Sequence, residues 1–283
     1  MLPRLARTGA VLVCLACVLG LLAGPAAARG PRARSSVIGG NAATLTDWGF
    51  TVAVFTPNSL CSGVVIAPTK VLTAAHCVGN PLTTLIRANS TNAFAGGEVL
   101  NVTSAAIAPG FANGFVNDLT VLTLRNATSA QPIGLPSAAE DASYAQPGAP
   151  LQAAGFGDRN PLIVGKRRIG LLSAADVIVR RCGLLPPSTL CDAGGRAGTV
   201  TRRLREHVQR RKVNKTICEG DSGGPLVART PAGPRLIGIT EASSSPTKRN
   251  PFFFVRCGLH GFPSLHTRVF SFLSFIQGSL AQP

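Results

Sequence analysis

Acidic residues are scarce in this chain: its 283 residues include 12 Asp and Glu against 28 Lys and Arg, which gives a formal net charge of +16. The first 36 residues contribute five of the arginines and no acid, so +11 remains for the rest of the chain. A positive field of this kind attracts anionic partners without selecting among them. The charge therefore identifies no specific partner, and no specific nucleic-acid binding is expected.

A long apolar run is missing after the N-terminal region, and no internal repeat or long low-complexity segment is evident. A membrane-spanning helix needs about 20 consecutive apolar residues, so no transmembrane segment is predicted. At the N-terminus, Arg4 and Arg7 precede an apolar run at residues 11–22, and alanines follow at 26–28. This order is typical of a secretory signal peptide. Residues 1–28 are therefore predicted to direct secretion, and the protein is expected to be extracellular.

Eight cysteines are present, and Cys14 and Cys17 fall within the predicted signal peptide. The other six are Cys61, Cys77, Cys182, Cys191, Cys218 and Cys257. An even number in an oxidising compartment predicts three disulfides, although counting does not choose among the pairings. The alternative weighed for Cys257 is a structural zinc site with His260 and His266.

Short apolar runs separated by Gly, Pro, Asn and Ser dominate the rest of the sequence. Examples are residues 51–55, 64–66, 120–124 and 236–240. Runs of this length between turn residues are typical of strands, so a mostly β protein is predicted. Residues 137–150 are flanked by prolines and are predicted to connect two β units, while residues 268–277 are predicted to form a closing helix.

The most informative motif is CEGDSGGP at residues 218–225, which places Ser222 on a glycine-flanked turn. Glycine permits the backbone angles that aim successive N–H groups into one concavity. A serine nucleophile needs such donors together with a base within hydrogen-bond reach. Turns of this kind are usually only structural, but two further segments change the interpretation: His76 in LTAAHC at 72–77, and Asp118 immediately before a strand-like segment.

In the order His76, Asp118, Ser222, these segments resemble the chymotrypsin/trypsin-like serine proteases, whose catalytic triad has that chain order. The resemblance runs from Val37 to about Gln277. It implies an all-β fold of two six-stranded antiparallel Greek-key barrels, at about 37–140 and 150–270, followed by a C-terminal helix. The protease domain would occupy residues 37–283.

The resemblance also implies roles for individual residues. Ser222 would be the nucleophile, His76 the general base and Asp118 the carboxylate that orients it, with the N–H groups of Gly220 and Ser222 as the oxyanion hole. The implied disulfides are Cys61–Cys77, Cys182–Cys191 and Cys218–Cys257. The expected protein is a monomeric serine endopeptidase acting on proteins or peptides, with no cofactor and no metal.

Residues 37–40, VIGG, resemble the new N-terminus that the family forms when a pro-segment, here residues 29–36, is removed. The resemblance implies that the α-amino group of Val37 inserts beside Asp221, so the precursor would be inactive. Ser36 precedes Val37, whereas the family usually has Arg or Lys before the cut.

Four positions correspond to the family's primary substrate pocket: Thr216, Glu241, Ser243 and Ser264. Relatives that cleave after Arg or Lys carry an aspartate at the position of Thr216, so the neutral residue here predicts cleavage after apolar residues. Glu241 replaces the family's usual serine beside the triad. An acid so close to Asp118 is expected to raise a carboxyl pKa, to weaken substrate docking, or to turn inward and supply an anion to the pocket.

An unusually long segment, residues 192–215, is rich in basic residues. They include Arg202, Arg203, Arg205, Arg210, Arg211, Lys212 and Lys215, with Glu206 between them. The favoured interpretation of the cluster at 202–215 is a solvated insertion. The alternative is polyanion binding, without base stacking, because interleaved aromatic residues are lacking. For the whole protein, the alternative to a protease is a catalytically weak homologue that acts as a cationic polyanion- or surface-binding protein. A second insertion, residues 244–256, has no counterpart in the family.

Overall fold

The structure is a computed structural model that describes residues 37–111, 116–159, 169–203, 208–243, 257–259 and 263–282. By its contacts the chain separates into Met1–Ala33 and Arg34–Pro283, and all described residues belong to the second unit. The predicted signal peptide and pro-segment, residues 1–36, lie outside the described residues. They remain predictions.

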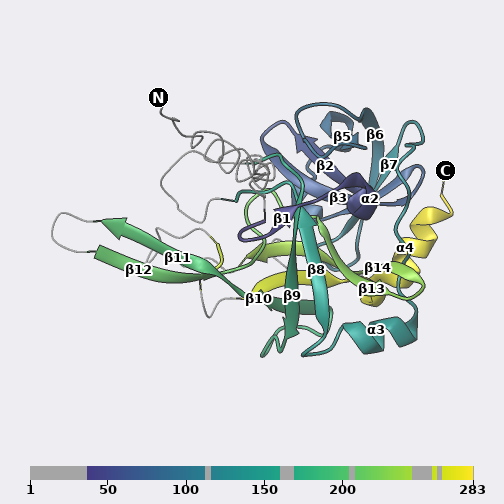
Figure 1. Ribbon diagram of the computed structural model, residues 1–283. Helices are drawn as coiled ribbons and strands as arrows, with labels where there is room; N and C mark the ends of the chain where they lie inside the picture. The colour runs from purple at the N-terminus through teal and green to yellow at the C-terminus, as the bar shows by residue number, and fades with distance from the viewer. Residues whose placement is uncertain are drawn as a thin grey trace, which may run out of the picture. The chain divides into compact units, whose positions relative to one another are not determined.

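Six strands of the N-terminal half form a closed antiparallel barrel (Figure 1). They are β2 (Thr51–Thr56), β3 (Ser59–Ala67), β4 (Lys70–Thr73), β5 (Leu85–Ala88), β6 (Glu98–Ile107) and β7 (Thr120–Leu124), in the order β2-β3-β4-β7-β6-β5. The β2–β5 pairing closes the ring. Short helical turns η1 (Ala75–Cys77) and η2 (Pro81–Thr83) follow β4, so His76 sits at the end of a barrel strand.

Six strands of the C-terminal half form a second ring. They are β8 (Pro150–Gly155), β9 (Ser173–Arg180), β10 (Thr189–Gly194), β13 (Pro225–Thr230), β14 (Gly233–Ser243) and β15 (Ser264–Arg268), and the β8–β9 pairing closes the order β9-β10-β15-β14-β13-β8. The short strand β1 (Asn41–Ala42) adds to the outside of β9, and α2 (Leu45–Trp48) leads from it into β2. The predicted pair of six-stranded barrels is confirmed.

The connector between the barrels contains a helix that the sequence analysis missed, α3 (Ala138–Tyr144). Ser137 accepts a hydrogen bond from the Glu140 N–H, and the Glu140 carboxylate accepts one from the Ser137 N–H. This reciprocal capping box satisfies two donors that a helix start leaves unpaired. The S-x-x-E spacing was visible in the sequence as a helix-start signal.

The C-terminal helix is confirmed, with a later start than predicted. Arg268 is the last residue of β15, and the chain then passes through η3 (Val269–Phe272) into α4 (Leu273–Leu280). Arg268 is held in the strand because its N–H donates to the Ser188 carbonyl and its guanidinium pairs with the buried Asp141. These long-range contacts are invisible to local sequence patterns.

The three disulfides are Cys61–Cys77, Cys182–Cys191 and Cys218–Cys257, the pairs that the resemblance implied. Their formation leaves Cys257 no thiolate to offer a zinc ion, and His266 instead contacts Asp192. His260 lies outside the described residues. The zinc alternative is therefore unsupported at two of its three positions.

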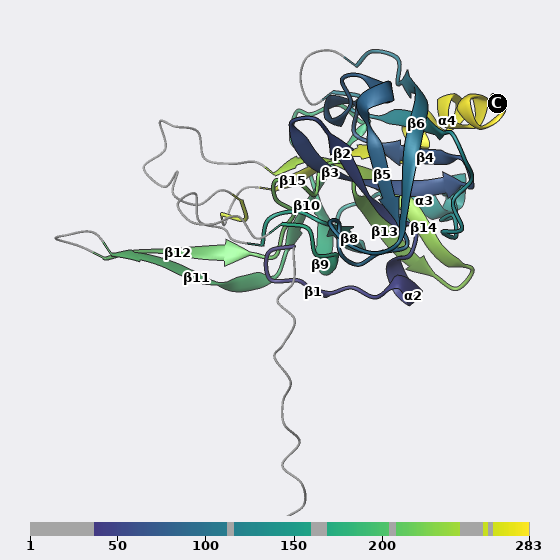
Figure 2. The same cartoon turned by 90° about the horizontal axis from the view of Figure 1, so that it is seen from above.

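The long basic insertion forms a two-stranded antiparallel ribbon of β11 (Arg196–Arg203) and β12 (Val208–Asn214). Figures 1 and 2 show this ribbon extending away from the two barrels. The insertion at 244–256 lies outside the described residues. Within the described part of the chain, none of the helices has the length and apolar character required to cross a membrane.

Candidate active site

His76 and Asp118 are joined by two hydrogen bonds. The His76 N–H donates to Oδ1 of Asp118 at 2.8 Å, and the His76 Nδ1 lies 2.5 Å from Oδ2. Asp118 is fully buried, whereas about a third of the His76 side chain is exposed. Because an ionised carboxylate only accepts hydrogen bonds, Nδ1 carries the ring proton, and Nε2 is the nitrogen of the ring that acts as an acceptor.

The position of His76 is fixed by its neighbours in the chain. Ala74 and Ala75 are buried against the barrel, and Cys77 is bonded to Cys61 in β3. The Cys77 sulfur lies 3.7 Å from Nε2 of His76, but a disulfide sulfur has no proton to donate. Cys61, His76 and Cys77 lie close enough to suggest a metal site. The disulfide removes both thiolates that such a site would need.

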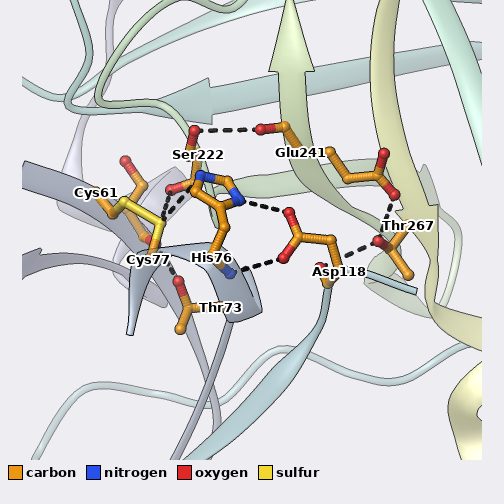
Figure 3. Close-up of polar contacts among 9 residues, drawn as sticks. Cys61, Thr73, His76, Cys77, Asp118, Ser222, Glu241 and Thr267 are labelled. Atoms are coloured by element: carbon orange, nitrogen blue, oxygen red, sulfur yellow. Dashed lines mark hydrogen bonds and ion pairs between the residues drawn. A yellow bond between two sulfur atoms is a disulfide. The ribbon is translucent and has the colours of Figure 1, made fainter. Parts of the chain in front are cut away.

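Ser222 lies beside the His76 ring on the loop that precedes β13 (Figure 3). Its hydroxyl donates to the main-chain carbonyl of Glu241 at 3.2 Å. A hydroxyl has one proton to donate, so attack by Ser222 requires that this proton turn from Glu241 toward Nε2 of His76.

Two N–H groups beside the Ser222 hydroxyl have no acceptor among the described residues, those of Gly220 and Ser222 itself. Their neighbours are engaged: the Asp221 N–H donates to the Cys218 carbonyl, and the Gly223 N–H donates to Thr240 at 2.7 Å. Gly220 has φ +95°, in the left-handed region that favours glycine. This alternation leaves two donors for a developing oxyanion.

Ser62 in β3 ties the nucleophile loop to the first barrel, and the sequence analysis missed it. The Ser62 N–H donates to the Ser222 carbonyl at 2.8 Å, and its hydroxyl donates to the Gly220 carbonyl at 2.9 Å. The same hydroxyl accepts from the Phe156 N–H at 3.0 Å. Ser62 is fully buried. No local motif marks this serine, because its partners lie about a hundred or more residues away in sequence.

Glu241 is the extra residue of a bulge in β14: Thr240 pairs with His266, and Ala242 pairs with the next residue back, Leu265. Bulges re-aim side chains and are common beside active sites. The Glu241 side chain is buried and its Oε1 lies 2.6 Å from the Thr267 hydroxyl, while its Oε2 has no hydrogen-bond partner among the described residues. Burial raises the pKa of Glu241 to about 8; the Thr267 hydrogen bond opposes this shift and the Asp118 carboxylate adds to it.

The proposed pocket residues do not share one surface. Thr216 and Ser264 are buried, with their hydroxyl oxygens 2.6 Å apart. Side chains alternate between the faces of a strand, so Ser264 and Thr267 in β15 project to opposite faces. Glu241, which contacts Thr267, therefore lies on the triad side, as expected for an acid close to Asp118, and not beside Ser264, where the alternative of an inward anion would place it. Ser243 ends β14 opposite Ser264 in register.

Asp192 and His266 form a buried pair that the sequence analysis did not anticipate. Nε2 of His266 lies 2.8 Å from Oδ2 of Asp192, and both side chains are fully buried. The other ring nitrogen lies 3.3 Å from the Thr240 hydroxyl. Asp192 pairs in register with Ser264, so this pair lies next to the Thr216–Ser264 hydroxyls.

Asp221 is fully buried directly before Ser222. Its two carboxylate oxygens accept from the N–H groups of Gly157 at 2.7 Å and Cys218 at 2.8 Å. Burial raises the pKa of Asp221 to about 7, against the effect of these two hydrogen bonds and with a contribution from Asp158. Val37 is also fully buried, and the next residue, Ile38, exchanges backbone hydrogen bonds with Thr216.

A cavity of about 380 Å³ opens beside the nucleophile. Its described lining includes His76, Ser222 and Gly220, the Cys61–Cys77 disulfide and Leu60, and Glu219 contributes the one acidic side chain of that lining. The cavity therefore adjoins all the groups needed for an acyl transfer: base, nucleophile and oxyanion donors.

Two antiparallel barrels with an Asp–His pair from the first and a glycine-flanked serine from the second define the class of double-barrel serine hydrolases. The comparisons agree with this class. The family model described as Trypsin matches residues 37–276, and the chain belongs to that family.

Individual relatives differ in length and in what they are named for. The chain is 31% identical over 242 residues to "Trypsin" of Saccharopolyspora erythraea, covering 79% of this chain and 94% of that protein. It is 31% identical over 276 residues to "Serine protease 56" of Homo sapiens, covering 91% of this chain but 41% of that protein. It is 28% identical over 258 residues to "Glucanase inhibitor protein 1" of Phytophthora sojae, covering 86% and 88%. The family thus includes proteins named as proteases and one named as an inhibitor.

Proposed function

We propose that this chain is a secreted serine endopeptidase that hydrolyses peptide bonds through an acyl-enzyme on Ser222. The observation that carries the proposal is the double hydrogen bond between His76 and Asp118, which orients the imidazole ring with Nε2, its basic nitrogen, beside Ser222. The three disulfides support the extracellular assignment, because such bonds persist in oxidising compartments.

In the proposed reaction, the Ser222 oxygen attacks the carbonyl carbon of the substrate while its proton passes to Nε2 of His76. The resulting oxyanion is stabilised by the N–H groups of Gly220 and Ser222. His76 then returns the proton to the leaving amine as the C–N bond breaks, and Asp118 stabilises the charged imidazole throughout. Water attacks the acyl-enzyme by the same route and releases the acid product.

Activation is proposed to follow cleavage before Val37. The new α-amino group would lie beside Asp221, and a neighbouring cation favours the charged form of a carboxyl group. The burial of both residues, and the raised pKa of Asp221, support this partner. A chain starting at Val37 should therefore be far more active than one starting at Ser36. Equal activity of the two would exclude the activation step without affecting the roles of His76 and Ser222.

The proposed specificity is for apolar residues before the scissile bond. Thr216 and Ser264 hydrogen-bond to each other, so they offer a substrate cation no charged partner. A buried unpaired cation costs about 3–5 kcal/mol, whereas an apolar side chain loses nothing on entering a neutral pocket.

Labelling with a fluorophosphonate tests the activated nucleophile without knowledge of the natural substrate. We expect the label on Ser222 in the chain that starts at Val37, and no labelling of Ser222→Ala or His76→Ala. A folded, correctly started chain that takes up no label would instead favour the catalytically inactive homologue.

A further inference from the structure

The β11–β12 ribbon, called the basic ribbon here, packs against the second barrel at its root. Val213 is buried there with Ile38, Leu259 and the Cys218–Cys257 disulfide, and the Asn214 N–H donates to the Gly258 carbonyl at 2.7 Å. Among the described strands, the two pair only with each other (Figures 1 and 2), and Val213 at the root adds a single bridge to Leu259. The part beyond the root therefore adds little to the barrel core.

The register of the basic ribbon places an uncharged residue opposite every basic one. The pairs are Arg196–Asn214, Lys212–Thr199, Arg211–Val200, Arg210–Thr201, Arg202–Gln209 and Arg203–Val208. Like charges directly opposite each other are destabilising in a sheet, and this register avoids them. Neither strand contains an acidic residue, so the ribbon supplies no cross-strand anion of its own.

Arg196, Arg210 and Lys212 are exposed. Arg210 and Lys212 are two residues apart in β12, so they project from the same face at a spacing of about 6.6 Å. A row of cations on an extended, projecting element is suited to successive anionic groups of a linear polymer rather than to one small anion.

We propose that the basic ribbon is a binding surface for a linear sulfated polysaccharide. Sulfate groups need only cationic hydrogen-bond donors, which arginine and lysine provide. Single-stranded nucleic acid binding generally adds aromatic stacking platforms, and residues 193–217 contain no Phe, Tyr or Trp. A membrane surface requires an apolar face, and Val208 is the ribbon's only exposed large hydrophobic residue among those described.

The test measures binding of dextran sulfate to the purified full chain over a series of salt concentrations, with uncharged dextran as the reference. The ribbon variant is Arg196→Gln/Arg210→Gln/Lys212→Gln, which leaves the buried root unchanged. The matched control is Arg125→Gln/Arg180→Gln/Arg181→Gln, which removes three exposed cations outside the ribbon. Both variants lower the net charge equally, so any difference in their binding of dextran sulfate reflects where the removed cations lie.

We expect the ribbon variant to bind dextran sulfate at least about tenfold more weakly, with a salt slope smaller by about one per residue removed. The control should stay within about twofold of the unmodified chain. Arg196→Lys/Arg210→Lys should retain most of the binding, because the charge is kept. Thermal unfolding of each variant verifies that it is folded.

Three results would overturn the proposal. One is equal loss of binding in the ribbon and control variants, and another is binding of the unmodified chain no stronger than to uncharged dextran. The third is equally tight binding of oligodeoxythymidine of the same charge, which would assign the surface to nucleic acid. None of these results depends on peptidase activity, so they test the binding surface independently of the proposed peptidase function.

Discussion

The Thr267 hydroxyl lies 2.6 Å from the Oε1 of Glu241 and 3.1 Å from the main-chain carbonyl oxygen of Asp118. This hydroxyl has a single proton and cannot donate to both acceptors. If Glu241 is protonated, it donates to Thr267, and Thr267 donates to Asp118. The raised pKa of Glu241 agrees with this arrangement, in which a neutral carboxylic acid lies behind the triad at neutral pH.

We expect Glu241→Gln to change how stability depends on pH. The pKa of Glu241 is raised from 4.5 to about 8, so the folded state favours its protonated form. The contribution of Glu241 to the free energy of unfolding is fully present below about pH 4.5 and is lost as pH rises toward 8. The unmodified chain should therefore lose stability relative to Glu241→Gln across that window, by at most about 1.4 kcal/mol per pH unit. Urea unfolding at several pH values measures this, and parallel curves would contradict it.

The same substitution should alter the alkaline limb of the activity profile. Ionised Glu241 would compete with the Asp118 carbonyl for the Thr267 proton and place a second negative charge beside Asp118. We expect kcat/KM of the unmodified enzyme to fall above about pH 8, the pKa of Glu241, and the Glu241→Gln enzyme to lack that step. A shared alkaline limb in both enzymes would exclude a role for this ionisation.

Asp192→Ala should destabilise the fold strongly. The substitution leaves His266 fully buried without its carboxylate partner, and breaking a buried pair from one side costs about 3–5 kcal/mol. Asp176→Ala is the matched control, because Asp176 is exposed and bonds Gln152 at the surface of β9. The control should lower the free energy of unfolding by less than about 1 kcal/mol. Chemical denaturation measures both variants, and equal losses of unfolding free energy would contradict a stabilising role for the buried pair.

Gly223→Ala should abolish activity through packing rather than backbone strain alone. A Cβ at Gly223 would lie 2.0 Å from the Thr73 hydroxyl and 2.3 Å from the Ser62 carbonyl. Gly148 also has a positive φ, +97°, but a Cβ there meets nothing within 4 Å. Gly148→Ala therefore isolates the backbone cost of about 1 kcal/mol. Full peptidase activity in Gly223→Ala would contradict the close fit between the nucleophile loop and β4.

Thr216→Asp should convert the substrate preference. The substitution places a carboxylate beside Ser264, where a substrate Arg or Lys would find a partner. Profiling a peptide library should show cleavage after apolar residues by the unmodified enzyme and a gain of cleavage after Arg and Lys in the variant. Dominant cleavage after Arg or Lys by the unmodified enzyme would refute the neutral pocket.

The sequence predicted the two barrels, the cysteine pairs through the resemblance, and the neighbouring placement of His76 and Asp118. These depend on short motifs and strand periodicity, which are local signals. It missed the pair of Asp192 and His266 because the two residues lie 74 positions apart in sequence, and only the β10–β15 register brings them together. It placed Glu241 beside Asp118 but left the direction of its side chain open, because the bulge in β14 is set by pairing with β15 and not by the residues of β14.

The proposed peptidase mechanism requires that Ser222 form a covalent acyl intermediate. Rapid-mixing hydrolysis of an activated nitrophenyl ester by the chain starting at Val37 tests it, because faster acylation than deacylation gives a burst of product. We expect a burst of about one equivalent per active chain, mass spectrometry that places the acyl group on Ser222, and no burst in Ser222→Ala. A burst that persists in Ser222→Ala, or an acyl group on another residue, would contradict it.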